Sequence, residues 1–347
     1  MRFADNRNKI GKYIPAVVFL IFIYGMALWF IFSPKPDYSS SEKRYLQKFP
    51  EVTAEKLLSG DFGSEFETFF ADRFPQRNTW VGLNAYTALA VGNNGASGVY
   101  NCKNGYLINK PVSTENNLDK NIGAVADFAK SIDTPTTVML VPSTGYIVDD
   151  VLPTFHDKYN DDEDISKISS TLSKDKIGFV DLRERFKSEY KNGSQLYYKT
   201  DHHWTTKGAY TGYQELCKAL GITPIDDSTL KKDSYPDFYG TTYSSSGFWL
   251  TPPDNIEIWN NPKNSDRNIS VKITEGANIK TSGSMYFTDH LKEDDKYPVF
   301  IDGNHALTEI TNTNAKNGTI LLIKDSFSHS LAPVSYTHLR AHETPEH

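Results

Sequence analysis

Two short polar runs, far apart in the chain, carry the residue types of an acyl-transfer centre. Residues 201–204 read Asp-His-His-Trp, and residues 324–326 read Lys-Asp-Ser. A serine nucleophile needs a neighbouring imidazole to take its proton, and that imidazole needs a carboxylate to hold its tautomer. If the fold brings Ser326, His203 and Asp201 together, they would supply nucleophile, general base and orienting carboxylate.

The Asp-His-His-Trp run has two further interpretations. Asp201, His202 and His203 could bind a metal, although no further ligand stands near them in the sequence to complete a set. The run also lacks the additional aspartate clusters that a cytosolic phosphoesterase of the Asp-His-His type would need. The simplest alternative is a structural histidine beside an aspartate in a turn. We expect neither a metal nor a cofactor.

Segments of strand and helix character alternate around these runs. Short apolar runs predict buried strands, and 3.6-residue periodicity predicts helices. Alternation of this kind favours a parallel sheet with helices on both faces, in which functional groups lie at the carboxyl ends of strands. Ser326 directly follows such a strand. The predicted strands are 136–141, 177–182 and 319–323, and the predicted helices are 118–130, 164–174 and 206–220.

An uncharged apolar stretch near the N-terminus, residues 13–32, is long enough to cross a membrane as a helix. The twelve residues before it carry four basic side chains against Asp5 alone, which predicts a cytoplasmic N-terminus. A cleaved signal peptide is the alternative, but it usually has a shorter apolar region and an A-x-A-like site. No such site follows here, so an uncleaved single-pass anchor is favoured.

The composition is that of a folded protein without a nucleic-acid partner. Of the 347 residues, 38% are hydrophobic, which suffices for a core, and the net charge of −6 gives no basic face. The two cysteines, Cys102 and Cys217, could pair outside the cytosol. Two separate, partly buried thiols are slightly favoured.

These patterns divide the chain into successive parts. A cytoplasmic tail (1–12) and a membrane anchor (13–33) precede a helical juxtamembrane segment (34–95). An α/β domain (96–334) follows, in which residues 222–318 are rich in Asn, Asp, Pro, Ser and Tyr and predict a loop-rich insertion with short strands near the site. Its aromatic residues suggest contacts with sugar rings, and a decorated β-region without a ligand is an equal alternative.

The last residues depart from the apolar pattern. Residues 335–347 resemble adaptor read-through at the end of an assembled reading frame, and they hold His338, His342 and His347. A helix should follow the strand that bears the nucleophile, and the sequence predicts none. We therefore expect a foreign tail, a truncated domain and no functional role for these three histidines.

Further motifs accompany the two polar runs. They are Phe49–Glu51, Leu57–Phe62, Phe66, Asp72–Arg77 and Asn104–Leu107. Together with Thr200–Trp204 and Lys324–Ser326 they resemble the DHHW protein family, which is similar in turn to the SGNH-hydrolase-like proteins that O-acetylate alginate. The resemblance covers about residues 42–333 and implies an SGNH-like fold.

The resemblance implies roles for individual residues. It makes Ser326 the nucleophile, His203 the base and Asp201 the orienting carboxylate, whereas Trp204 fixes the loop. The glycine that precedes Asp-Ser in SGNH enzymes is Lys324 here, which leaves the oxyanion donors open. The backbone N–H of Ser326 or Phe327 is one candidate, and the loop at 143–144 is another.

The implied function is serine-dependent O-acetylation of a cell-surface or exported polysaccharide by a single-pass bacterial membrane protein. Its domain would lie outside the cytosol, so a membrane-bound O-acyltransferase partner would hand over the acetyl groups. A polysaccharide O-acetylesterase is the nearest alternative, because the same triad serves both reactions. A non-catalytic carbohydrate-binding or assembly protein of the cell envelope is the third.

Overall fold

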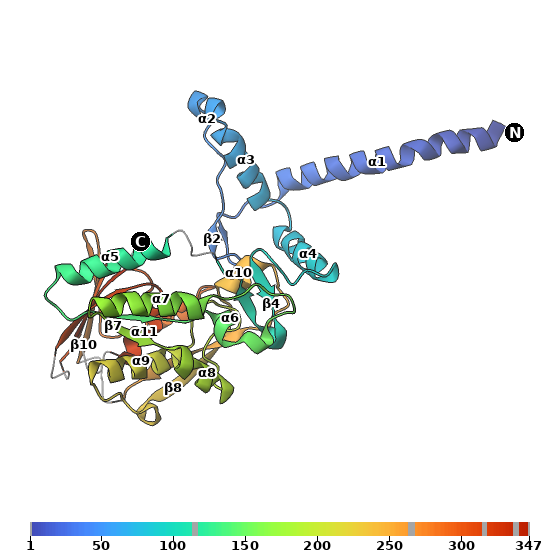
Figure 1. Ribbon diagram of the computed structural model, residues 1–347. Coiled ribbons are helices and arrows are strands. Elements are labelled where there is room, and N and C mark those ends of the chain that lie inside the picture. The colour runs from blue at the N-terminus through green and yellow to red at the C-terminus, as the bar shows by residue number, and fades with distance from the viewer. Residues whose placement is uncertain (1, 113–116, 263–267, 314–317, 336–339, 346–347) are drawn as a thin grey trace. The chain divides into compact units, whose positions relative to one another are not determined.

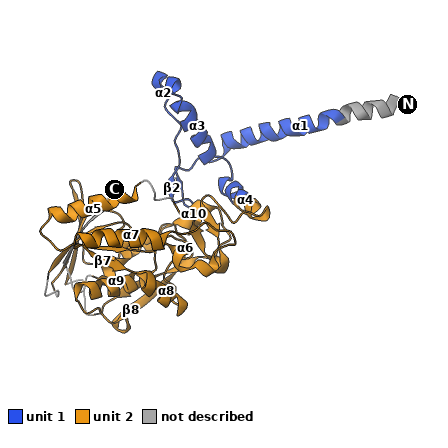
Figure 2. Ribbon diagram, viewed as in Figure 1, with its two compact units in different colours: residues 1–84 blue, residues 85–347 orange. Residues whose placement is uncertain are grey.

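The structure is a computed structural model that describes residues 2–112, 117–262, 268–313, 318–335 and 340–345, with side chains from Lys12 to Ser335 within these ranges. The chain forms two compact units, residues 1–84 and 85–347 (Figure 2). Each unit is described by itself below.

Unit 1 is mainly helical, as the sequence predicts for the juxtamembrane segment. Its aromatic side chains recur at helical spacing, and they pack within the unit, with Phe70 4.6 Å from Phe30 and Phe69 5.4 Å from Phe49 between ring centroids. The elements are α1 (Arg2–Phe32), β1 (Tyr38–Ser39), β2 (Arg44–Tyr45), α2 (Ala54–Ser59), α3 (Asp61–Asp72) and α4 (Arg77–Ala90), the last of which continues into unit 2.

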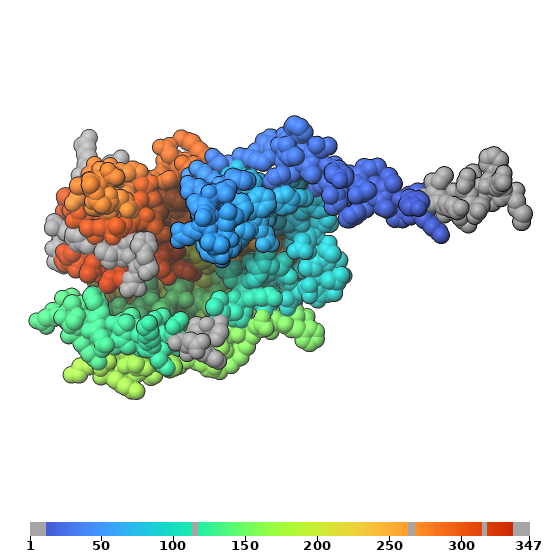
Figure 3. All heavy atoms as spheres, turned by 90° about the horizontal axis from the view of Figure 1, so that it is seen from above, coloured from blue at the N-terminus to red at the C-terminus, as the bar shows by residue number. Residues whose placement is uncertain are grey.

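The long helix α1 contains the predicted anchor. Among the described residues, its segment Lys12–Phe32 is the one helical span long and apolar enough to cross a membrane. Most of its side chains are exposed, and Figure 3 shows the segment as a rod. A signal sequence at the same place would meet the same criteria of length and composition.

Unit 2 has the mixed α/β character that the sequence predicts. Its helices are α5 (Leu118–Ser131), α6 (Thr144–Ile147), α7 (Asp161–Lys174), α8 (Arg183–Lys191), α9 (Thr206–Leu220), α10 (Thr241–Ser246) and α11 (Ser328–Ser335). Its strands are β3 (Gly95–Ala96), β4 (Val99–Asn101), β5 (Leu107–Asn109), β6 (Thr137–Leu140), β7 (Gly178–Asp181), β8 (Lys231–Phe238), β9 (Asp254–Asn260), β10 (Ile269–Glu275), β11 (Asn278–Ser282), β12 (Leu307–Asn312), β13 (Thr319–Lys324) and β14 (Arg340–Pro345).

Parallel and antiparallel pairing both occur among the described strands. The pair β6–β7 is parallel, with Thr137 opposite Gly178, and so is β13–β14. A five-stranded sheet has the order β11-β10-β12-β14-β13, in which the other neighbours are antiparallel. The strands β3, β4 and β5 form an antiparallel sheet, and β8 pairs with β9.

Helix α9 is central to the packing of unit 2. It contacts α8 and α11, while α5 contacts α7 (Figure 1). Its buried face lies against the fully buried Trp204 at two glycines. A Cβ on Gly208 would lie 2.3 Å from the Leu196 carbonyl oxygen, and one on Gly212 would lie 2.9 Å from the Trp204 ring. The absence of these side chains lets the helix approach the Asp-His-His-Trp loop.

In the described part of residues 222–318, where the sequence predicts a loop-rich insertion with short strands, five strands occur, β8 to β12. The segment after β13 differs from the sequence-based expectation. A helix, α11, does follow the strand that bears Ser326, and the expectation that none is present was wrong. Proline normally disfavours a helix interior, so Pro333 argued against a helix here. The buried side chains of Leu331 and Val334 stabilise α11 by packing.

Candidate active site

The loop that carries Asp201 and His203 is a tight backbone reversal before α9. The Tyr198 N–H donates to the His203 carbonyl (3.2 Å), and the Thr205 N–H donates to the Leu196 carbonyl (2.8 Å). Thr205 then caps α9, because its hydroxyl accepts from the Gly208 N–H at 3.1 Å. The loop therefore has a defined end at the helix.

A buried carboxylate, Asp254 at the start of β9, fixes the same loop. It accepts the backbone N–H groups of Lys199 (2.9 Å) and Thr200 (2.7 Å), and also the Thr200 hydroxyl (2.7 Å) and the Gln195 amide (3.0 Å). Charge-assisted hydrogen bonds of this kind are stronger than neutral ones. They restrain the backbone immediately before Asp201.

Ser326 lies in the turn between β13 and α11. The Asp325 side chain accepts the Phe327 N–H at 3.0 Å, and the Ser328 N–H donates back to the Asp325 carbonyl. Trp204 joins this turn to the Asp-His-His-Trp loop, since its indole N–H donates to the Phe327 carbonyl (2.8 Å) and the Ser330 hydroxyl (2.9 Å). The two motifs are thus tied directly.

The three residues predicted from the sequence lie in hydrogen-bonding distance of one another. His203 Nε2 is 2.8 Å from Ser326 Oγ, and His203 Nδ1 is 2.5 Å from Asp201 Oδ1. Asp201 and His203 are buried, whereas Ser326 is half-buried. This is the order serine, imidazole, carboxylate that deprotonation of a serine requires.

The Asp201 carboxylate is held at the start of α10. Its Oδ2 accepts the Thr241 N–H (2.7 Å) and the Thr241 hydroxyl (3.1 Å), while Oδ1 also accepts the His203 N–H (2.9 Å). Burial by itself would raise the pKa of Asp201, but His203 and these donors outweigh burial and lower the pKa. A Cβ on Gly240 would lie 2.2 Å from Oδ2, so glycine is required beside this carboxylate.

Tyr297 is a site residue that the sequence analysis missed. Its ring stacks on the His203 imidazole with a centroid distance of 4.0 Å and an interplanar angle of 12°. Its hydroxyl donates to the Ser326 carbonyl at 3.2 Å, and Phe327 lies 4.9 Å from His203. Tyr297 therefore contacts both the imidazole and the serine backbone.

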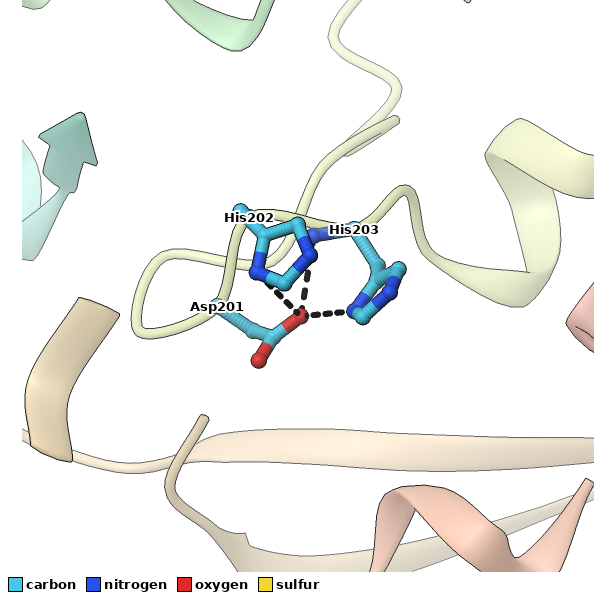
Figure 4. Close-up of side chains that lie close together, drawn as sticks. All are labelled: Asp201, His202 and His203. Atoms are coloured by element: carbon cyan, nitrogen blue, oxygen red, sulfur yellow. Dashed lines mark hydrogen bonds and ion pairs between the residues drawn. The ribbon is translucent and has the colours of Figure 1, made fainter. Parts of the chain in front are cut away.

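Asp201, His202 and His203 form a compact group (Figure 4) whose ligand atoms lie within 4.8 Å of one another. Their proximity has an explanation without a metal, because Asp201 Oδ1 already accepts from His203 Nδ1 and Oδ2 from Thr241. His202 Nδ1 hydrogen-bonds Thr241 Oγ1 at 2.5 Å. The expectation that no metal is bound stays a prediction.

Of the oxyanion donors that the sequence suggested, two are occupied. The Phe327 N–H donates to Asp325, and the Ser143 N–H donates to the Asp161 carboxylate at 2.6 Å. The Ser326 N–H makes no hydrogen bond to a described residue. It is the candidate that remains available in the turn.

The two cysteines are buried thiols away from the triad, and the expectation that the C-terminal histidines have no role stays a prediction. Cys102 and Cys217 are both buried free thiols, and burial raises the pKa of Cys102 to about 12. His338 and His347 lie outside the described residues, and only the backbone of His342 is described.

Comparison with known protein families matches residues 108–236 to the family described as SGNH hydrolase-like domain, acetyltransferase AlgX. This segment includes Asp201 and His203, whereas Ser326 lies beyond it. No curated protein matches the chain by sequence. The predicted resemblance to SGNH-like acetyltransferases is therefore confirmed for this segment.

Solved structures confirm the α/β, SGNH-like fold class. A DHHW family protein from Eubacterium siraeum has a TM-score of 0.57 and 17% identity, with 72% of this chain and 83% of that chain covered. Bacillus cereus PatB1 has a TM-score of 0.59 and 19% identity, with 70% and 85% covered. PatB1 is also known with a sulfonyl adduct, at 18% identity and a TM-score of 0.59, with 71% and 84% covered.

Proposed function

We propose that this protein, whose SGNH-like domain is similar to that of the acetyltransferase AlgX, transfers acetyl groups to a cell-envelope polysaccharide through Ser326. The observation that carries the proposal is the continuous hydrogen-bonded series from Ser326 Oγ through His203 to Asp201. A serine hydroxyl alone is a weak nucleophile, and an adjacent imidazole oriented by a carboxylate activates it.

The reaction has two steps. His203 Nε2 takes the Ser326 proton while Oγ attacks the carbonyl of an acetyl ester, and the protonated imidazole then gives its proton to the leaving oxygen. An acceptor hydroxyl next attacks the acetyl-serine as His203 takes its proton. The buried, ionised Asp201 stabilises the imidazolium that forms in both steps.

The rigid setting of His203 suits this role. Asp201, Ser326 and the Tyr297 ring restrain the imidazole from three sides. The Ser326 N–H, which has no hydrogen-bond partner in the described part of the chain, lies beside the nucleophile and would donate to the oxyanion. A group positioned before substrate arrives needs no reorganisation during the reaction.

A sugar polymer fits the surroundings of the site. Half-buried aromatic rings cluster next to Thr241, with Tyr239 4.3 Å from Tyr243 and Tyr243 5.2 Å from Trp249. Aromatic side chains offer large apolar faces together with polar tips, which suits carbohydrate surfaces. These rings support polysaccharide as the acceptor.

The organisation of the chain follows from this role. Residues 13–33 would anchor the protein as a single span, residues 34–95 would connect the anchor, and residues 96–334 would act outside the cytosol. Acetyl donors of the cytosol are not available there. A membrane-bound O-acyltransferase that carries acetyl groups across the bilayer would supply them.

Trapping the acyl-serine tests the proposal. Full-length protein in detergent micelles is treated with p-nitrophenyl acetate or phenylmethylsulfonyl fluoride, and the modified peptide is identified by mass spectrometry. We expect modification at Ser326, loss of ester turnover by at least about 1,000-fold in Ser326→Ala, and near-normal turnover in the control Ser328→Ala.

The outcomes separate the competing functions. Acetyl transfer to an oligosaccharide supports the transferase, whereas release of acetate alone in the presence of acceptor would identify an esterase. Unmodified Ser326, together with polysaccharide binding that is equal in the parent and in Ser326→Ala, would refute catalysis and favour a binding protein.

A further inference from the structure

The Thr241 hydroxyl lies between two groups of the site and makes a hydrogen bond to each. Thr241 Oγ1 is 3.1 Å from Asp201 Oδ2 and 2.5 Å from His202 Nδ1. A hydroxyl has one proton to donate and two lone pairs to accept with. Only one of these two hydrogen bonds can therefore use the threonine proton.

The carboxylate determines which one. Asp201 is ionised, since its pKa is lowered, and an ionised carboxylate only accepts hydrogen bonds. The Thr241 proton therefore points to Asp201 Oδ2, and the Thr241 oxygen accepts a proton from His202 Nδ1. His202 Nδ1 also lies 4.0 Å from Asp201 Oδ1, whose negative charge favours a proton on this nitrogen.

The other nitrogen of His202 is consequently a hydrogen-bond acceptor. Burial, and then the charge of His203, lower the pKa of His202, so the ring is neutral and carries a single proton. With that proton on Nδ1, Nε2 presents a lone pair. It has no hydrogen-bond partner among the described residues, and the side chain keeps 35% of its surface exposed.

Two imidazoles thus stand side by side beside the nucleophile. The rings of His202 and His203 have centroids 3.9 Å apart and an interplanar angle of 36°. His203 Nε2 faces Ser326 Oγ, whereas His202 Nε2 is open to a ligand. The ring of Phe327, the residue after the nucleophile, lies 5.7 Å from that of His202.

We propose that His202 Nε2 accepts a hydrogen bond from a second hydroxyl of the acceptor, next to the hydroxyl that His203 deprotonates. The acceptor class is then a carbohydrate unit with neighbouring hydroxyls, and His202 is the residue that distinguishes it from water or a simple alcohol. This inference rests on the proposed acyl transfer through Ser326.

The role applies to the second step of the reaction. The first acceptor hydroxyl loses its proton to His203 Nε2, its oxygen bonds to the acetyl carbon, and the bond from that carbon to Ser326 Oγ breaks. The proton then passes from His203 to Ser326 Oγ, which restores the enzyme. The second hydroxyl keeps its proton and shares it with His202 Nε2, so His202 binds and orients without taking part in proton transfer.

A pair of matched acceptors tests this role. Full-length protein in detergent micelles is acetylated with p-nitrophenyl acetate in the presence of trans-cyclohexane-1,2-diol or cyclohexanol, which differ by one neighbouring hydroxyl. Release of p-nitrophenol reports acylation, and the yields of the two acetate esters report transfer. The variants are His202→Phe, which removes the acceptor atom, and His202→Gln, which retains one in its amide oxygen.

We expect the parent protein to prefer the diol, and His202→Phe to reduce this preference by about two- to tenfold, the range for one neutral hydrogen bond. His202→Gln should recover part of it. The preference for the diol compares two esters formed from the same acetyl-enzyme, so any change in the rate of acylation, which p-nitrophenol release reports, cancels from it.

Three results would overturn the inference. An unchanged preference for the diol in His202→Phe, with normal acylation of Ser326, would remove the role of His202 and leave the proposed function intact. Absence of acylation in the parent would remove both. A ¹⁵N spectrum of His202, assigned by its loss in His202→Phe, that shows the proton on Nε2 would refute the tautomer on which the role depends.

Discussion

A buried histidine close to the candidate site predicts how the stability of the protein depends on pH. His329 on α11 is 2% exposed, and neither of its ring nitrogens has a hydrogen-bond partner in the described part of the chain. Burial, and then the charges of Lys324, His203 and His305, lower its pKa to about 2. The ring therefore stays neutral in the folded protein.

The unfolded chain behaves differently, because an unperturbed histidine has a pKa of about 6.5. Above that pH both states are neutral and His329 adds no pH dependence. Below that pH the unfolded state gains a proton that the folded state does not. The free energy of unfolding therefore decreases as the pH is lowered, until the folded ring is protonated near pH 2. Between pH 7.5 and 5.0 the loss amounts to about 2 kcal/mol.

The substitution His329→Leu should abolish this loss. Urea unfolding of the full chain in detergent micelles, followed by tryptophan fluorescence at both pH values, measures the free energy of unfolding of parent and variant. The stability of the variant relative to the parent should rise by about 2 kcal/mol between pH 7.5 and pH 5.0.

The exposed His156 supplies the matched control, since His156→Leu removes an imidazole that the protein does not enclose. Carboxylates contribute equally to parent and variant and cancel in the difference. A relative stability of His329→Leu that does not change with pH would show that His329 is not held neutral by burial, and would refute the reasoning.

Three substitutions probe the supports of the candidate site. In Gly240→Ala the new Cβ would displace the Asp201 carboxylate and lower ester turnover by about a hundredfold, whereas Gly123→Ala, with open space around it, should stabilise α5 by about 0.5–1 kcal/mol in urea unfolding. Asp254→Asn should lose about 2 kcal/mol of unfolding free energy, because charge-assisted bonds to the loop disappear. Trp204→Phe should lower kcat/KM for p-nitrophenyl acetate, since the hydrogen bonds to Phe327 and Ser330 are lost. Normal ester turnover in Gly240→Ala or in Trp204→Phe would contradict the proposed support.

Much of the local structure could be predicted from periodicity. The helix predicted over residues 206–220 is α9 with the same bounds, and the strand predicted over 319–323 is β13, one residue longer. The prediction that this strand is buried was wrong, because Leu321 and Ile323 are exposed. The segment of α9 has a single buried face, and the segment of β13 is a continuous apolar run. Because that strand ends just before Ser326, the prediction of a functional group at its carboxyl end needed no tertiary information.

The supports of the site could not be predicted in this way. The supporting contacts come from residues that lie 40 to 94 positions further along the chain. Thr241 contacts Asp201, Asp254 contacts the loop before Asp201, and Tyr297 contacts His203. Each of the three stands at the first residue of its element, which is α10, β9 or the 3₁₀ helix Tyr297–Val299, and periodicity does not indicate a contact with a distant loop at such a position. Only the tertiary structure could have distinguished Tyr297 from the many other tyrosines of the chain.

The site is assembled from separate segments, and this determines whether a substitution should change kcat or KM. His203 is restrained by Asp201, Ser326 and the ring of Tyr297 before any substrate is bound. The entropy lost in ordering the imidazole therefore belongs to folding and not to substrate binding. Loosening the imidazole, as Tyr297→Leu would, should lower kcat more than it raises KM, because an imidazole that leaves its position still permits binding but seldom deprotonates the serine. Loss of His202, whose proposed hydrogen bond is to the acceptor, should act in the opposite sense and raise the acceptor KM.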